Sequence, residues 1–412
     1  MSFNNPYQKT YLTVRTVLLT LFLLIIKAGS SSIHAQQTFT PEMLQDEYFR
    51  FSEKGALSPS ALHVQLLLIT SGTTITNAFG HVALRVYTRP GSRDGDYYID
   101  FGNYSESLAF VIRFLKGKAL FYTNVVPTNW SLASWTKTGR GVLAYEIRLN
   151  DAEKTRFLKT LDASIRETEN GYEYHNFENN CVTYIRNVIE RAVQSPVSLS
   201  EASMAGHNTW RSRVWPYSER ILWLQIGENF LFNYRTDEKR NGRDLVYLPY
   251  DLKQALLDMG RLGPEQEVLK DHWQSVQGTS PIRNWFFLAL TCLVLISQIP
   301  GVRKASLGRK FYAWTAGGIG ILVWSVSFLT DFDFMSKNAL VLVFTPADFL
   351  LARTSLLEKF KTKLSLLALT RIAMGLIAGA MAIFMPQQVF LPLAAGLIFW
   401  LLFFVRIKKG YL

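Results

Sequence analysis

Cysteine is scarce in this sequence, which has only two among its 412 residues, Cys181 and Cys292. Cys292 falls within a strongly apolar segment and Cys181 within a mixed, water-compatible one. Because these locations place the two thiols in different environments, a disulfide between them is not expected. The fold therefore has to be held by packing and hydrogen bonds rather than by cross-links.

Histidine is almost as rare, with six in the chain. No group of cysteines and histidines has the spacing of metal ligands, so neither a metal nor another cofactor is expected. The sequence also has no internal repeat and no low-complexity tract. These observations favour a globular part that carries its chemistry on a few individual side chains.

Net charge is absent from the central part of the chain. Residues 36–284 contain 28 Lys and Arg and 28 Asp and Glu, although the whole chain has a formal net charge of +12. The excess lies in the first 35 residues and in residues 285–412. This distribution follows membrane topology, and it does not predict binding to nucleic acid.

The N-terminus has the layout of a secretory signal. Lys9 and Arg15 precede the apolar run Val17 to Ile26, and small and polar residues follow as far as Ala35. Ile33 is larger than the residue usually found near a cleavage site, so an uncleaved anchor is the alternative. We expect residues 1–35 to be a signal peptide and residues 36–284 to form an exported domain.

The C-terminal part, residues 285–412, is almost entirely apolar and predicts an all-α transmembrane bundle of about five helices. The candidate spans are Trp285 to Ile299, Phe311 to Thr330, Asn338 to Ala352, Leu364 to Met385 and Val389 to Val405. The first and third are short for a bilayer, which allows a tilted or re-entrant path. Basic residues follow the first, third and fifth spans, whereas the opposite loops carry few. The positive-inside tendency therefore places residues 36–284 outside the cytoplasm.

The exported domain reads as α+β with an antiparallel sheet. Strands are expected at Leu62 to Thr70, His81 to Thr88, Asp96 to Phe101 and Gly141 to Leu149. A helix should begin near Asp151, and a second near Cys181 after a cap at Asn179 or Asn180. The aromatic segment Arg220 to Arg235 fits either an ordinary packed helix or one lying at the membrane surface.

The stretch HNFENNCVTYIRNVIE places Cys181 in the first turn of its predicted helix. There the helix dipole favours the thiolate, which is the nucleophilic form, and free backbone N–H groups could hold an oxyanion. A single thiol in an exported domain is also a flag for reactivity or for pairing with another chain. A buried, inert cysteine is the alternative.

A thiol nucleophile usually has an imidazole partner, and we select His81 for this role. His81 opens a strand directly after a glycine turn in AFGHVALRV, and Asp100 lies on the next strand in YYIDFGNY. Asp100 could accept the second ring N–H and so fix the tautomer of His81. Either residue alone is more often structural, so the hypothesis depends on the ordered set His81, Asp100 and Cys181.

The order of these residues resembles the circularly permuted papain-like fold, as in the lecithin:retinol acyltransferase and NlpC-type superfamily. FGHVALRV, YYIDFGNY, YHNFENNCVTYIRNVIE, NTWRS and VYLPYDLKQAL together look like the N-terminal periplasmic domain of the Lnb-type bacterial lipoprotein N-acyltransferases. The resemblance covers most of residues 60–260, and the multi-span C-terminal part has a similar layout. Two departures are that a basic residue appears only at Arg186 after Cys181, and that the segment Asp331 to Lys337 lacks histidine.

The resemblance implies an acyltransferase of the bacterial inner membrane with its N-terminal domain in the periplasm. Cys181, helped by His81, would take an acyl chain from a membrane phospholipid as a thioester. The N-terminal amine of a diacylglyceryl-cysteine lipoprotein would then accept the chain. Asn180, Tyr174 and His175 are further candidates for the surroundings of the thiol or for the oxyanion side. Asp348 and Arg371, which are costly in a membrane, are functional candidates by default.

Two other functions use the same residues differently. A membrane-tethered cysteine hydrolase of the NlpC type would transfer the acyl group to water, although a soluble substrate does not require five spans. A membrane receptor or assembly factor would keep Cys181 as a core residue.

Overall fold

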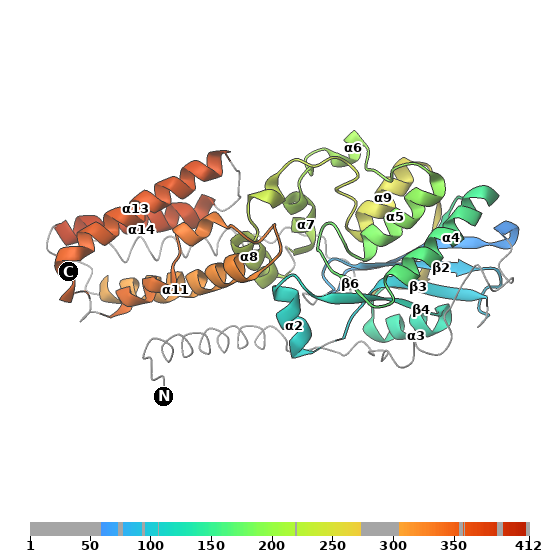
Figure 1. Cartoon of the computed structure of the whole chain (residues 1–412), viewed down its shortest axis with the longest axis horizontal. Coiled ribbons are helices and arrows are strands. Elements are labelled where there is room, and N and C mark those ends of the chain that lie inside the picture. Colours follow the sequence, from blue (N-terminus) through green and yellow to red (C-terminus); the bar gives the residue numbers. More distant parts are fainter. Residues whose placement is uncertain are drawn as a thin grey trace, which may run out of the picture.

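The computed structural model describes residues 59–272 and 305–408, apart from gaps at 73–76, 93–94, 106, 219–220, 354–356, 358 and 385–389. The predicted signal peptide, the first predicted span with Cys292, and the boundary at residue 284 lie outside the described residues. Figure 1 shows a sheet covered by helices at one end of the molecule and long helices at the other.

The sheet of the first part is antiparallel throughout and has seven strands in the order β6-β4-β3-β2-β1-β5-β7. The strands are β1 His63–Ile69, β2 His81–Tyr87, β3 Asp96–Asn103, β4 Leu120–Pro127, β5 Val142–Ile147, β6 Tyr172–Glu173 and β7 Leu262–Leu269. The four predicted strands correspond to β1, β2, β3 and β5, and the α+β prediction is confirmed. The permuted papain-like relationship stays a prediction.

Helices cover both faces of this sheet (Figure 1). On one face, α4 Asp151–Glu167, α5 Cys181–Val193 and α9 Pro249–Asp258 share a core with alternate residues of β1, including Leu66 and Leu68. On the other face, Trp135 of α3 Thr128–Thr138 packs with the intervening residues Leu67 and Ile69. Because both faces are covered, β1 is buried along nearly its whole length, and its residues do not alternate between buried and exposed.

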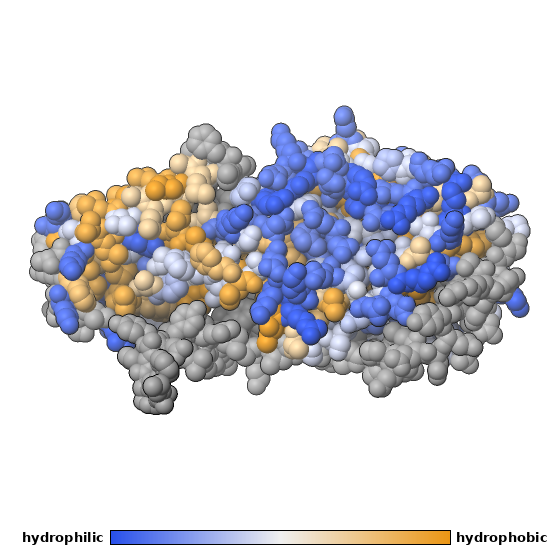
Figure 2. Space-filling model, in the orientation of Figure 1, coloured by the Kyte–Doolittle hydropathy of each residue, from blue (hydrophilic) through white to orange (hydrophobic). Residues whose placement is uncertain are grey.

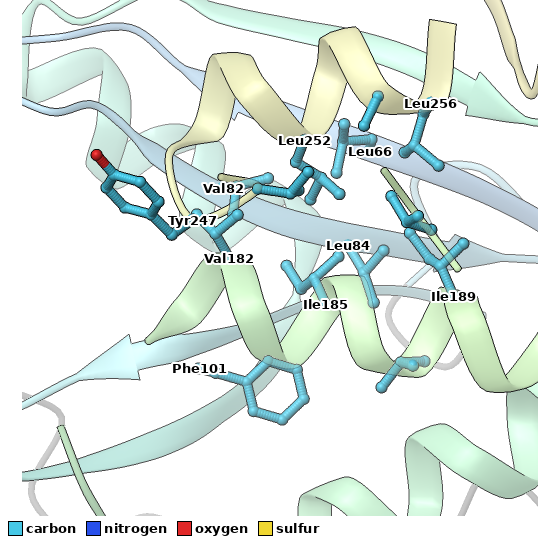
Figure 3. Close-up of a cluster of buried hydrophobic side chains, with 14 of the residues drawn as sticks. Leu66, Val82, Leu84, Phe101, Val182, Ile185, Ile189, Tyr247, Leu252 and Leu256 are labelled. Carbon is cyan, nitrogen blue, oxygen red and sulfur yellow. The ribbon is translucent and has the colours of Figure 1, made fainter. Parts of the chain in front are cut away.

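Helix α5 is the element that carries the thiol, and its apolar stripe fixes it against the sheet. Val182, Ile185 and Ile189 lie on the side that faces Leu84 of β2 and Phe101 of β3 (Figure 3). All five side chains are buried. The sheet therefore sets the rotation of α5 and the position of its first turn.

The remaining elements of the first part lead toward the apolar helices. They are η2 Pro59–Ala61, α2 Leu108–Leu115, α6 Glu201–Met204, α7 Trp210–Ser218, α8 Leu222–Leu231 and η3 Tyr234–Asp237. Helix α8 occupies the segment for which the sequence allowed two readings. It packs into the protein, because Phe230 is buried in the same cluster as residues of the apolar part.

The apolar part contains α11 Ala305–Leu329, α13 Lys361–Phe384 and α14 Phe390–Lys408. Within the described residues, two segments are long and apolar enough to cross a membrane, Tyr312–Leu329 and Lys363–Met381. Figure 2 shows that hydrophobic residues dominate the surface of this end, in contrast to the polar first part. Two of the predicted spans are thus confirmed as apolar helices of sufficient length, and the complete bundle stays a prediction.

The third predicted span, for which the sequence also allowed a tilted or re-entrant path, does not form a continuous helix. Residues 338–352 instead form two short 3-10 helices, η4 Ala339–Leu342 and η5 Pro346–Ala352. Pro346 interrupts the backbone hydrogen bonding, and η5 lies close against α11. A Cβ at Gly320 of α11 would come within 2.4 Å of the Thr345 carbonyl carbon, so glycine makes this close approach possible.

The loop after α11 fastens the two parts together. Phe332 and Phe334 are buried in the core of the first part, and the Asn233 side-chain amide donates to the Asp333 carbonyl at 2.7 Å. Asn338 donates at 2.7 Å to the Phe230 carbonyl in α8. This arrangement agrees with the charge pattern, which placed the loop on the same side of the membrane as the exported domain.

Asp348 and Arg371 form a buried ion pair that stabilises residues 338–352, which we call the broken segment. Arg371 donates to both carboxylate oxygens of Asp348, at 3.0 and 2.8 Å, and also to the carbonyls of Leu342 and Val343. Trp324 donates at 3.0 Å to the Phe344 carbonyl. In an apolar environment unpaired carbonyls are costly, so Arg371 and Trp324 make the non-helical path tolerable.

We expect Arg371→Met to destabilise the apolar part, because it leaves the buried Asp348 carboxylate without its cation and the Leu342 and Val343 carbonyls without the guanidinium. Removing one member of a buried ion pair costs about 3–5 kcal/mol. The measurement is the thermal unfolding midpoint of the full chain in detergent, which should fall by about 5–10 °C. Arg353→Met, at an exposed arginine just after η5, is the matched control. Equal midpoints for the two variants would contradict the role of Arg371.

Candidate active site

Asn180 sets the geometry at the start of α5. Its side-chain oxygen accepts the N–H groups of Val182 and Thr183 at 2.9 and 3.0 Å, as an N-cap residue should. Its amide nitrogen donates to the carbonyls of Asn176 and Tyr247, at 2.7 and 3.1 Å. Through these four hydrogen bonds, the Asn180 side chain connects the loop before α5 and the segment before α9 to the first turn of α5.

The capping changes what is available for an oxyanion. Asn180 occupies two of the first-turn N–H groups that the sequence suggested were free, and its own amide hydrogens are both engaged. Within the described residues, the backbone N–H of Cys181 has no hydrogen-bond partner. The anion-binding capacity of this helix start is therefore concentrated at Cys181 itself.

His81 and Asp100 meet beside this helix start. His81 is the first residue of β2, after a turn in which Gly80 has a left-handed φ of 77°. The His81 Nε2 atom lies 3.6 Å from Asp100 Oδ1 on β3, and Asp100 Oδ1 also accepts the Gly102 N–H at 2.9 Å. With Nε2 directed at the carboxylate, Nδ1 is the nitrogen left for the thiol.

Gly102 and Trp135 hold the imidazole, and the sequence reasoning did not identify either. A Cβ at position 102 would come within 2.6 Å of His81 Cε1, so only glycine leaves room for the ring. The Trp135 ring lies 5.9 Å from the His81 ring. The glycine in DFGN could have been noted as a close-approach position, but nothing in the sequence links Trp135 to His81.

Cys181 and His81 are coupled electrostatically. Burial by itself lowers the pKa of His81, but the negative charge of the Cys181 thiolate, with hydrogen bonds to Asp100 and Cys181, raises it to about 10. This pKa keeps the imidazole positively charged at neutral pH, and a cation beside a cysteine is the kind of environment in which nucleophilic thiols are found. The structure thus brings together the three residues proposed as catalytic.

The other candidate residues occupy different places. Tyr174 lies close enough to the thiol to be affected by its charge. Burial and the charge of Cys181 raise the pKa of Tyr174 above its usual range, so its hydroxyl stays protonated and can donate a hydrogen bond. His175 faces the loop after α11 instead, with Nε2 at 3.3 Å from Asp333 Oδ1 and Nδ1 accepting the Glu178 N–H. His175 therefore belongs to the junction between the two parts.

A metal site is not apparent in the described part of the chain, where no group of three or more His, Cys, Asp or Glu side chains could hold an ion. The chemistry that these residues support is nucleophilic attack by sulfur with proton transfer by imidazole.

We expect His81 to remain protonated at pH 8, because the thiolate and Asp100 hold its pKa near 10. Cys181→Ala removes the largest contribution that raises the pKa, so His81 should then titrate at lower pH.

The folded-state pKa of His81 exceeds the unfolded value of 6.5. The free energy of folding that comes from this pair is therefore complete below pH 6.5 and is lost as pH rises toward 10. NMR of ¹³C-labelled histidine in the full chain checks this; deprotonation of His81 near pH 6.5 in the unmodified protein would contradict it.

Comparison with known proteins adds the family. Residues 50–214 match the Lnb N-terminal periplasmic domain, and this range contains His81, Asp100 and Cys181. Searches of curated proteins and of solved structures found no match. The match, with the apolar helices that follow, indicates a membrane protein whose N-terminal domain is periplasmic. Over residues 50–214, this chain is similar to the Lnb N-terminal periplasmic domain family.

Proposed function

We propose that this protein is a lipoprotein N-acyltransferase of the bacterial inner membrane, with several membrane spans. It moves an acyl chain from a membrane phospholipid, through a thioester on Cys181, to the N-terminal amine of a diacylglyceryl-cysteine lipoprotein. The observation that carries the proposal is the contact of Cys181, His81 and Asp100 within an Lnb-type periplasmic domain. The apolar helices attached to that domain favour substrates that reside in the bilayer.

In the first half-reaction the Cys181 thiolate attacks the carbonyl carbon of the phospholipid ester. The oxyanion that forms is stabilised by the Cys181 N–H at the start of α5, with the protonated Tyr174 hydroxyl as a second donor. The intermediate collapses by breaking the bond to the glycerol oxygen, which takes the proton from the His81 imidazolium. A lysophospholipid leaves, and the acyl group remains on sulfur as a thioester.

In the second half-reaction the amine of the lipoprotein attacks the thioester carbonyl. His81, now neutral, accepts the proton that the amine nitrogen loses, and the carbon–sulfur bond breaks to regenerate the thiolate. The product is an amide, which completes a triacylated N-terminus. Asp100 acts on His81 at Nε2, where it orients the ring and stabilises the imidazolium in both half-reactions.

Transfer to water by the same three groups would make the protein a hydrolase. The two reactions differ in what happens without an acceptor amine, because an acyltransferase accumulates the thioester whereas a hydrolase discharges it. The apolar helices favour the first outcome, since a lipid donor and a lipidated acceptor both have to be reached from the membrane.

We expect the full chain, purified from its membrane without acceptor, to carry an added mass equal to one fatty acyl group on Cys181. Cys181→Ala should abolish this adduct and lower formation of triacylated lipopeptide by at least about 1,000-fold, because Cys181 is the only cysteine in the part of the chain that the structure describes. Intact-protein and peptide mass spectrometry measure both quantities. Cys292→Ala, at the other cysteine of the sequence, should behave like the parent. Undiminished triacylation by Cys181→Ala would refute the proposal.

We expect Gly102→Ala to disable the site while leaving the fold intact. The new Cβ would lie 2.6 Å from His81 Cε1, so the ring has to move away from the positions defined by Asp100 and Cys181. Misplacement of about 1 Å costs on the order of 100-fold in rate, so acyl-enzyme formation should fall at least tenfold. Gly318→Ala is the matched control, because nothing lies within 4 Å of the Cβ added there. Normal acylation by Gly102→Ala would contradict the assigned position of His81.

A further inference from the structure

Helix α8 carries three buried polar side chains whose polar atoms are not fully paired. Gln225, Glu228 and Asn229 are 1%, 4% and 6% exposed, and their i, i+3, i+4 spacing places them on one side of the helix. In the described part of the chain, no hydrogen-bond partner is found for Gln225 Nε2, Asn229 Oδ1 or either carboxylate oxygen of Glu228. Buried polar groups are normally paired, so three such residues on one helix face require an explanation.

The nearest charged group does not neutralise Glu228. Arg211 is fully buried, but its guanidinium is directed to Asp237 at 2.8 Å, to the Phe232 carbonyl and to the backbone carbonyl of Glu228. Ser218 lies close to the Glu228 carboxyl, yet its hydroxyl donates to the Trp215 carbonyl at 3.3 Å. The Glu228 carboxyl is therefore buried without a cation of its own.

This lack of a partner changes the acidity of Glu228. Burial raises its pKa to about 8, and the nearby Ser218 and Arg211 oppose the shift only in part. A positively charged hydrogen-bond donor would stabilise such a buried, unpaired carboxyl, because an ion pair with hydrogen bonds would replace a buried group that has no partner.

The place of α8 in the fold suggests where such a donor would come from. The last carbonyls of α8, from Phe230 and Leu231, accept the side-chain amide of Asn338, which directly follows the loop after α11. Phe230 packs against Phe344, with ring centroids 5.9 Å apart, in the cluster of the apolar helices. Helix α8 therefore lies where the polar first part meets the apolar helices, which is the level of the lipid headgroups if these helices cross a membrane.

The unpaired atoms define the chemistry of the ligand. Three acceptors, the two carboxylate oxygens of Glu228 and Asn229 Oδ1, suit the three N–H bonds of a primary ammonium group. The donor, Gln225 Nε2, suits a phosphate or carbonyl oxygen next to it. We propose that Gln225, Glu228 and Asn229 form a binding site for a primary ammonium group carried by a lipid.

This inference rests on the proposed function, because both substrates of that reaction can carry such a group. One source is the ethanolamine headgroup of a phospholipid donor, and the other is the α-amine of the lipidated cysteine. A choline headgroup has no N–H bonds, and an acetylated amine has no charge, so each source has a matched lipid that the site should reject.

The test measures binding rather than turnover. The full chain carrying Cys181→Ala, which cannot be acylated, is titrated in detergent with dioleoyl phosphatidylethanolamine or phosphatidylcholine, and with a diacylated lipopeptide whose amine is free or acetylated. Native mass spectrometry gives the bound fraction. We expect at least one of the two ammonium compounds to bind about tenfold more tightly than its matched compound, which corresponds to about 1.4 kcal/mol. The compound that shows the preference identifies the source.

Glu228→Gln, added to Cys181→Ala, should remove this preference, because the amide has no charge and one acceptor fewer. Glu201→Gln, at an exposed glutamate in α6, is the matched control and should keep it. Asn229→Ala, also added to Cys181→Ala, is a second test that does not depend on whether Glu228→Gln folds. It should reduce the binding preference for the ammonium compound severalfold. The inference is overturned if neither ammonium compound is preferred, or if the preference survives both Glu228→Gln and Asn229→Ala. Failure of unmodified Cys181 to become acylated would refute the enzymatic proposal and leave this binding result unaffected.

Discussion

The four hydrogen bonds of the Asn180 side chain are the constraint on which the rest of the site depends. They end the loop before α5, begin the helix and connect it to the Tyr247 carbonyl, so the first residue of the helix has one position relative to the sheet. That residue is Cys181, and its N–H is the first-turn group left for an anion. The sheet then supplies His81 and Asp100 from neighbouring strands. A reactive thiol needs this rigidity because sulfur, imidazole and carboxylate act together only over short distances.

The junction between the two parts is built from polar contacts as much as from packing. Asn233 and Asn338 each bind backbone carbonyls across it, while Phe332 and Phe334 enter the core of the periplasmic domain. His175, which the sequence suggested for the thiol side, instead contributes to this junction through Asp333. A fixed junction gives the thiol a constant position relative to the apolar helices, as the proposed transfer between two lipid substrates would require.

Three buried ionisable residues show different solutions to the cost of removing charge from water. Arg371 and Arg211 each bind a carboxylate together with backbone carbonyls, and in both cases they also stabilise the end of a helix or an irregular segment. Glu228 has no such partner in the described part of the chain. The contrast matters because stable buried charges are almost always paired, so an unpaired one is more informative about ligands than a paired one.

The sequence by itself determined the α+β class, four of the strands, the starts of α4 and α5, and the apolar character of the C-terminal part. These features follow from local periodicity and capping, which act over a few residues. It also singled out Cys181, His81 and Asp100, because their residue types and order carry chemical meaning. Only the tertiary structure decided that β4, β6 and β7 complete the sheet, that Gly102 and Trp135 confine His81, and that residues 338–352 form a broken segment held by Arg371. Those features depend on contacts between residues distant in the chain, for which local sequence patterns carry no signal.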